Sequence, residues 1–133
     1  MSSYCILCLD DERIVLNSLR GELMRNFGAT YAYEFLDSPF DALEVIDEHQ
    51  QEGADVIVVI SDWLMPQMKG DEFLVKLHGK HPRIIKMLLT GQADEAAIDR
   101  AKREANLFKC IQKPWSEKEL VSSINEAINS ANS

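Results

Sequence analysis

The sequence lacks both a long hydrophobic run and an excess of positive charge. No apolar segment approaches the roughly 20 residues needed to cross a bilayer, and residues 1–9 lack the charged start and long apolar centre of a signal peptide. The 22 acidic residues outnumber the 14 basic ones, so the formal charge of -8 offers no net positive field to nucleic-acid phosphates or anionic lipids. We therefore expect a cytoplasmic chain that binds neither nucleic acid nor a membrane directly.

Cysteine is also scarce, and the count of three fits a reducing compartment. Cys5 and Cys8 have the spacing of a C-x-x-C motif, but they lie in an apparent strand, where residues three positions apart point to opposite faces of a sheet. A shared metal ion or a disulfide is therefore not expected. We interpret both residues as small buried hydrophobic side chains.

Five apolar segments alternate with helical patterns, and no repeat or long linker interrupts them. The predicted strands are Tyr4–Leu9, Tyr31–Leu36, Val56–Ser61, Ile84–Leu89 and Leu107–Ile111. The third contains five consecutive apolar residues, which is typical of a strand covered on both faces. Alternation of strands and helices predicts right-handed crossovers and a parallel sheet with helices on both faces.

The length of 133 residues and the 46% hydrophobic content predict one domain with one core, spanning residues 1–133. We expect short tails at residues 1–3 and 129–133, and no output domain in this chain. Helices are predicted at about 13–27, from a capping box at Ser38, after the 65–69 loop, at about 94–105, and from a second capping box at Ser116. The fourth helix has only Ile98 as a large apolar residue, so we expect it to be comparatively mobile.

Polar side chains stand at the carboxyl ends of four predicted strands. Asp10 and Asp11 follow the first strand, Asp62 the third, Thr90 the fourth and Lys113 the fifth. In open α/β sheets this rim is where ligands bind. Like charges placed close together repel unless a cation lies between them, so three carboxylates at one rim favour a hard divalent ion, best Mg²⁺.

Each of these residues also has an ordinary structural explanation. Asp10 or Asp11 can cap the first helix, and Asp62 can simply follow a strand, as aspartate often does in loops. Thr90 fits a turn, and an isolated lysine such as Lys113 is usually solvated. These explanations account for the residues one by one, but the combination is rarely produced by chance.

As a set, the residues resemble the receiver domain of two-component response regulators, which accept a phosphoryl group on an aspartate. The matching motifs are Leu9-Asp10-Asp11-Glu12, Asp62-x-x-Met65-Pro66-x-x-x-Gly70, Leu89-Thr90-Gly91 and Lys113-Pro114-Trp115. They occur in the family's order and spacing, and the resemblance covers essentially the whole chain. It implies an α/β, flavodoxin-like (βα)5 fold with a doubly wound five-stranded parallel sheet in the order 2-1-3-4-5.

The resemblance also implies a role for each residue of the site. Asp62 would be the phosphoacceptor, and Mg²⁺ would be bound by Asp10, Asp11, Asp62 and the backbone carbonyl of Leu64, with Asp11 a more direct ligand than Asp10. Thr90 would bond a phosphoryl oxygen. The lysine at position 113 would pair with the phosphoacceptor or its phosphate, with a cis peptide bond before the next proline.

By the same resemblance, the phosphoryl donor would be a histidine kinase or a histidine phosphotransfer domain. The output would be another domain or an effector protein, and a homodimer is a further option. The chain would catalyse its own phosphorylation and dephosphorylation, and the sequence assigns it no separate enzymatic activity. The added negative charge can draw the threonine and its loop inward, which changes the surface near the fourth helix.

Two features depart from the family pattern. Cys110 stands three positions before Lys113, where the family commonly has an aromatic residue that changes rotamer on phosphorylation. A thiol cannot replace a ring that swings, so we hypothesise that the fourth helix shifts instead. Leu64 and Gln92 stand two positions after the phosphoacceptor and the threonine, beside the path of a hydrolytic water in related domains. The apolar Leu64 predicts a comparatively long-lived phosphoryl state.

Other aromatic and titratable residues have simpler interpretations. Trp63 and Trp115 are expected to be packing residues near the rim whose fluorescence reports Mg²⁺. His49, His78 and His81 stand at or beyond helix ends, where interaction with the helix dipole or exposure is expected rather than metal binding.

Three other functions share parts of this sequence pattern. An aspartyl-phosphate hydrolase of the haloacid-dehalogenase kind would need an acid where Leu64 stands, and a flavin carrier would need a first loop less acidic than Asp10-Asp11-Glu12. A receiver-like binding module that is never phosphorylated remains the main alternative.

Overall fold

A five-stranded parallel sheet forms the centre of the molecule, in a computed structural model that describes residues 4–91 and 95–131. Its strands are β1 (Cys5–Leu9), β2 (Ala32–Leu36), β3 (Val56–Asp62), β4 (Ile85–Thr90) and β5 (Lys109–Gln112). Their order is β2-β1-β3-β4-β5, and every pairing is parallel. The predicted doubly wound, flavodoxin-like sheet order is therefore confirmed.

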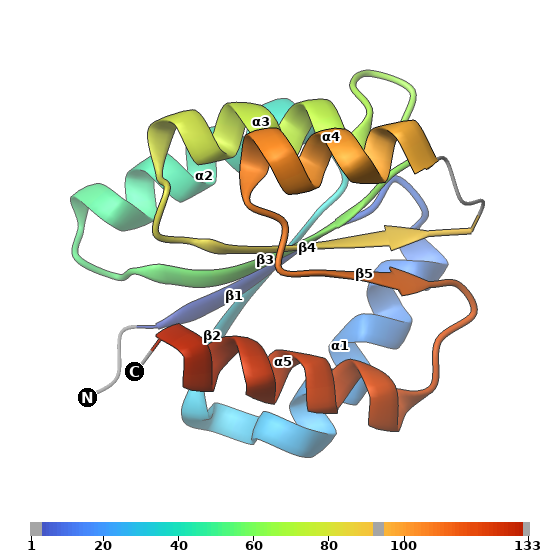
Figure 1. Cartoon of the computed structure of the whole chain (residues 1–133). Helices are drawn as coiled ribbons and strands as arrows, with labels where there is room; N and C mark the ends of the chain where they lie inside the picture. Colours follow the sequence, from blue (N-terminus) through green and yellow to red (C-terminus); the bar gives the residue numbers. More distant parts are fainter. Residues whose placement is uncertain (1–3, 92–94, 132–133) are drawn as a thin grey trace.

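Helices cover both faces of this sheet. They are α1 (Arg13–Phe27), followed by the short 3-10 turn η1 (Gly28–Thr30), α2 (Pro39–Gln51), α3 (Gly70–Lys80), α4 (Glu95–Ala105) and α5 (Glu117–Ala131). Figure 1 shows α2, α3 and α4 on one face and α1 and α5 on the other. No helix among the described residues is long and apolar enough to cross a membrane.

The boundaries differ from the predictions in a few places. Helix α5 continues to Ala131, so the tail predicted from residue 129 is wrong for residues 129–131. The sequence Asn129-Ser130-Ala131 has weak helix propensity, but Ile128 is still buried and holds this last turn against the sheet. The predicted N-terminal tail at residues 1–3 and the predicted helix start at Asp94 lie outside the described residues.

The core lies on both sides of the central strand β3, which is buried at every residue. The two cores contain alternate residues of β1, as the period of a strand requires. Cys5 packs with α2 and α3 on one side, and Cys8 packs with α1 and α5 on the other. Both thiols are free and buried, which confirms their interpretation as small hydrophobic residues.

Local signals set the starts of two helices. The Ser38 hydroxyl accepts a hydrogen bond from the Asp41 backbone N–H at 3.3 Å, and the Ser116 hydroxyl accepts one from the Glu119 N–H at 3.0 Å. Both predicted capping boxes therefore contribute their serine cap.

Helix α4 is attached to the sheet through small side chains. Its buried residues are Ala97, Ala101 and Ala105, and Ile98 is only partly buried. Burial of three alanines removes little apolar surface from water, so packing against the sheet stabilises this helix less than its neighbours. Its predicted mobility stays a prediction.

Two histidines have acidic partners that the sequence patterns did not indicate. His49 Nε2 lies 2.8 Å from Glu34 Oε2, which connects α2 to β2, and His81 Nε2 lies 2.7 Å from Asp47 Oδ1. Both partners are distant in the chain, so helix position alone could not identify them.

Candidate functional site

The acidic residues predicted to meet at the sheet rim do meet there. Strand β3 pairs with β1 on one side and with β4 on the other, in a register that sets Leu9 opposite Ser61. Asp10 therefore leaves β1 beside Asp62 at the end of β3. One carboxylate oxygen from each of Asp10, Asp11 and Asp62 lies within 4.8 Å of the others. The first and third of these side chains are buried, whereas Asp11 is exposed.

Asp10 has a second contact that supports the start of α1. Its Oδ1 accepts a hydrogen bond from the Glu12 backbone N–H at 2.8 Å. An acid at this position also interacts favourably with the positive end of the helix dipole. The N-cap residue of α1 is Glu12, and no side chain makes a cap hydrogen bond there, so the capping explanation for Asp10 and Asp11 is wrong. The two oxygens of Asp10 instead bond the Glu12 backbone and Lys113.

Lys113 joins two of the acids. Its Nζ lies 2.9 Å from Asp62 Oδ1 and 3.1 Å from Asp10 Oδ2. The Lys113 backbone N–H donates to the carbonyl of Thr90 at 2.8 Å, which fixes the loop after β5 against the end of β4. The peptide bond between Lys113 and Pro114 is cis. The predicted pairing of Lys113 with Asp62 is present in the structure.

The pKa values show how charge is balanced in this site. Burial raises the pKa of Asp62 to about 6; the hydrogen bond from Lys113 opposes this shift and the charge of Asp10 adds to it. Burial likewise raises the pKa of Asp10, against the hydrogen bond from Glu12 and the charge of Lys113. Burial lowers the pKa of Lys113, but its bonds to Asp62 and the charge of Asp10 outweigh burial and raise it overall.

The donor set suits a hard divalent cation. Three carboxylates converge while only one ammonium balances them, so negative charge exceeds positive charge among these groups. Oxygen ligands of this kind are preferred by Mg²⁺, which retains several waters. The residues that could hold it are Asp10, Asp11 and Asp62, with the Leu64 backbone carbonyl as the predicted fourth group.

A pocket of about 640 Å³ opens beside the carboxylates. Its lining includes Asp11, Asp62, Leu64, Gly91 and Lys113. The Leu64 side chain is 57% exposed at this pocket, so an apolar group faces the space from which water enters. Thr90, the last residue of β4, is buried one position before Gly91. The predicted role of Gln92 lies outside the described residues.

The backbone of the phosphoacceptor candidate is packed against the start of α3. The Gly70 N–H donates to the Trp63 carbonyl at 2.7 Å, and the Trp63 N–H donates to the Leu89 carbonyl at 2.9 Å. A Cβ atom at Gly70 would lie 2.2 Å from the Asp62 carbonyl oxygen, far inside van der Waals contact. The close approach of α3 to Asp62 therefore requires glycine at position 70.

Both tryptophans lie near this rim and use their indole N–H groups. Trp63 is buried and donates to Asp71 Oδ1 at 3.0 Å, and Trp115 donates to Glu22 Oε1 at 2.8 Å. The packing role predicted for Trp63 is confirmed. The sequence does not predict the role of Asp71, because a single acid in the first turn of a helix is common and carries no specific signal.

Comparison with known proteins identifies the family. A model of the response regulator receiver domain matches residues 6–125. The chain is similar to the sensor kinase CckA of Brucella abortus, with 28% identity over 127 residues that cover 96% of this chain and 13% of that protein. It is similar to the hydrogenase transcriptional regulatory protein HoxA of Bradyrhizobium diazoefficiens, with 28% identity covering 92% of this chain and 24% of that protein. The chain thus spans less than a quarter of the length of these relatives.

Solved structures agree with this result. The signal receiver domain of an HD domain-containing protein from Pseudomonas fluorescens superposes with a TM-score of 0.85 at 27% identity, covering 96% of both chains. A response regulator receiver domain from Clostridium thermocellum gives a TM-score of 0.85 at 26% identity, covering 97% of both chains. With the family match and the arrangement of acids and lysine at the sheet rim, these likenesses show that the chain belongs to the response regulator receiver domain family of two-component systems.

Proposed function

We propose that Asp62 accepts a phosphoryl group from a phosphohistidine, with Mg²⁺ bound by the neighbouring acids. The observation that carries this proposal is the buried Asp62 carboxylate, which shares the Lys113 ammonium with Asp10 at the edge of an open pocket. The donor is a histidine kinase or a histidine phosphotransfer domain, and the output is a domain or effector protein. The likeness to a sensor kinase and to transcriptional regulators supports such partners.

The reaction is a displacement at phosphorus. An Asp62 oxygen attacks, the O–P bond forms as the P–N bond of the phosphohistidine breaks, and the electron pair of that bond leaves on the imidazole, which is then protonated. Asp10, Asp11 and Asp62 would hold a Mg²⁺ ion, whose positive charge would reduce the repulsion between the attacking carboxylate and the phosphoryl group. Lys113 already contacts the attacking carboxylate and is placed to balance charge on the phosphoryl group.

The other residues of the site orient these groups. Gly70 and the backbone bonds of Trp63 fix the carbonyl of Asp62, which limits the positions open to its carboxylate. Thr90, at the end of the adjacent strand, is assigned to bond a phosphoryl oxygen. The reactive form of Asp62 is the ionised carboxylate, which the Lys113 hydrogen bond favours against the effect of burial.

The main alternative is a receiver-like binding module that is not phosphorylated. Such a module has no need for a buried carboxylate that shares an ammonium with a second acid, because burying charges is unfavourable in the absence of a function or a strong pairing gain. The retained Asp10, Asp62 and Lys113 cluster favours the phosphorylated switch.

The proposal is tested by intact-protein mass spectrometry after incubation with acetyl phosphate and Mg²⁺. The expected result is the mass of one added phosphoryl group, lost in Asp62→Asn. Asp37→Asn is the matched control, because Asp37 is an exposed aspartate that follows β2 at the same rim. Absence of the mass gain in the unmodified chain, or its persistence in Asp62→Asn, would contradict the proposal.

A further inference from the structure

Three side chains connect the residue after Asp62 to helix α4. The Trp63 indole N–H donates to Asp71 Oδ1 at 3.0 Å, and the other oxygen of Asp71 accepts from Arg100 Nη1 at 3.4 Å. Trp63 belongs to the loop after β3, Asp71 to the first turn of α3, and Arg100 to the middle of α4. The contacts therefore cross from the candidate phosphoacceptor to a second helix on the same face of the sheet (Figure 1).

The side chains of Trp63 and Asp71 are both held by the surrounding structure. Trp63 is 8% exposed, its backbone is bonded to β4 and α3, and its ring is contacted by the Lys69 ammonium at 5.1 Å from the ring centre. Asp71 is also buried, with a relative exposure of 7%. A buried carboxylate that has two donors on different elements is sensitive to movement of either donor, because losing one leaves it incompletely paired.

The third residue, Arg100, lies on α4, which packs against α3 and presents small side chains to the sheet. Next to Arg100, a hollow of about 270 Å³ lies between the loop and α4 and is lined by Trp63, Lys69, Asp71, Ala96, Ala97 and Arg100. The side of α4 that faces the sheet carries alanines. The ion pair between Asp71 and Arg100 is one of the contacts that position α4 against α3, and it is the one that also reaches Trp63.

We propose that Asp71 and Arg100 are positioning residues that couple the state of Asp62 to the position of α4. The inference rests on the proposed function, since the input is phosphorylation of Asp62. When the charge and geometry at Asp62 change, the adjoining Trp63 changes its bond to Asp71, and Asp71 in turn changes its hold on Arg100. The route consists of side chains in direct contact and uses neither Thr90 nor Cys110.

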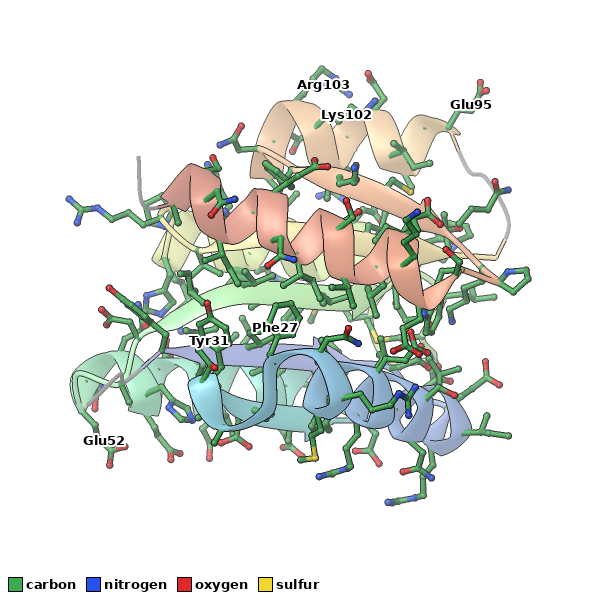
Figure 2. The ribbon with its side chains drawn as sticks, turned by 90° about the horizontal axis from the view of Figure 1, so that it is seen from below. Phe27, Tyr31, Glu52, Glu95, Lys102 and Arg103 are labelled. Carbon is green, nitrogen blue, oxygen red and sulfur yellow. The ribbon has the colours of Figure 1, made fainter. Side chains whose placement is uncertain are left out.

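The test uses Trp115→Phe as the parent, which leaves Trp63 as the sole tryptophan of a chain that has two. Beryllofluoride with Mg²⁺ serves as the phosphoryl mimic. Amide hydrogen exchange in α4 and Trp63 fluorescence are measured with and without the mimic in the parent and in Arg100→Gln. Arg103→Gln is the matched control, because Arg103 lies on the same helix, points to solvent (Figure 2) and pairs only with its own helix in the described contacts.

In the parent and in Arg103→Gln, the mimic is expected to change α4 exchange by about three-fold, the size expected for loss or gain of one partly buried ion pair. In Arg100→Gln this mimic-induced change is expected to fall below about half of the parent value. If Arg100 only stabilised α4, Arg100→Gln would raise amide exchange in α4 equally with and without the mimic. The mimic-induced change in exchange is therefore the decisive readout. Asp71→Asn, which keeps an acceptor for the indole, should reproduce the Arg100→Gln result.

The two possible failures are distinguishable. If the mimic changes neither Trp63 fluorescence nor the mass of the native complex in the parent, the proposed function is wrong and the coupling has no input. If the mimic binds but Arg100→Gln retains the full change in α4 exchange, the coupling is wrong and the proposed function is unaffected.

Discussion

Two lysines lie inside this molecule at opposite ends of the sheet, and their surroundings give them opposite properties. Lys113 follows the carboxyl end of β5 and contacts the carboxylates of Asp10 and Asp62. Lys86 is near the amino end of β4, is 1% exposed, and donates to the backbone carbonyls of Ile84 at 2.6 Å and Pro82 at 3.4 Å. Neither carbonyl carries a full charge.

The difference appears in the pKa values. Burial lowers the pKa of Lys86 to about 8, and no carboxylate of the described residues opposes this shift. Burial acts on Lys113 in the same direction, but Asp62 and Asp10 reverse the result and raise its pKa. Burial of a charged residue therefore does not by itself mark a functional site. The mark of the site is convergence of several charged groups from separate strands.

The largest expected effect comes from removing the charge of Lys113, the lysine that pairs with Asp10 and Asp62. Lys113→Met leaves two buried carboxylates without their shared ammonium, so phosphorylation of Asp62 by acetyl phosphate should slow by roughly 10²–10³-fold, as for loss of one preorganised charged donor. The rate is measured by mass spectrometry over time. Lys109→Met is the control, because Lys109 begins β5, the strand that Lys113 follows, but bonds the exposed Glu126 at 3.4 Å. Equal phosphorylation rates in Lys113→Met and Lys109→Met would contradict a specific role of Lys113 in the site.

Replacing Lys86, the buried lysine without a carboxylate partner in the described contacts, should improve the protein, because it raises the free energy of unfolding. Lys86→Met removes an ammonium that burial disfavours, so at pH 7 the free energy of unfolding should rise by up to roughly 3.5 kcal/mol, from a shift of about 2.5 pKa units at about 1.4 kcal/mol per unit. This is measured by urea denaturation, with the exposed Lys76→Met in α3 as control.

The pH dependence of this gain has a definite sign. A lowered pKa in the folded state means that the unfolded chain holds the proton more tightly, so the penalty is complete below pH 8 and disappears as pH rises from about 8 to 10.5. The advantage of Lys86→Met over the unmodified chain should therefore shrink across that range. A stability difference that is independent of pH would show that packing, not charge, is responsible.

A smaller effect is expected from the pKa of Asp62. Because this pKa is raised to about 6, Mg²⁺ has to displace a proton from Asp62 in more acidic solution, and affinity should fall by up to ten-fold per pH unit below 6. Titration followed by tryptophan fluorescence at pH 7, 6 and 5 measures this. A raised acid pKa also means that the contribution of Asp62 to stability decreases as pH rises from about 4 to about 6, in the absence of divalent ions.

The smallest expected effect is at Leu64. Leu64→Asn replaces the exposed apolar side chain at the pocket with a group that can hold a water, so loss of the phosphoryl group from Asp62 should accelerate by a few-fold, of the order of 1 kcal/mol in the barrier. Decay of the phosphorylated mass after removal of the donor measures it. Phe40→Asn, which changes another exposed apolar residue outside the pocket, is the control. An unchanged decay rate would contradict the role of Leu64.

The sequence predicted the strand-end residues because each is specified by its position along the chain. Asp62 and Lys113 stand directly after or near the ends of apolar strands, and parallel strands bring their carboxyl ends together. The sheet order itself came from the family resemblance, and the structure confirms it.

Other features could not be predicted because they depend on partners that are distant in sequence. In the sequence, Lys86 is a single charged residue within an apolar strand, which does not indicate on which side of the sheet it lies. Its burial becomes evident only in the folded structure. Asp71 and Arg100 are 29 residues apart, and each has an ordinary place on its own helix. The last turn of α5 was missed for the same reason, since burial of Ile128 outweighs weak local propensity.

The glycine at position 70 has one more consequence. With the first residue of α3 in contact with its carbonyl, Asp62 has no room to recoil when a bulky tetrahedral group is attached. Expansion has to be accommodated by the side chains around the carboxylate, which include Trp63 and Lys113. The rigid backbone under the acceptor thus gives the switch a fixed origin: chemistry at Asp62 is expected to move the side chains around it, while the backbone of β3 stays in place.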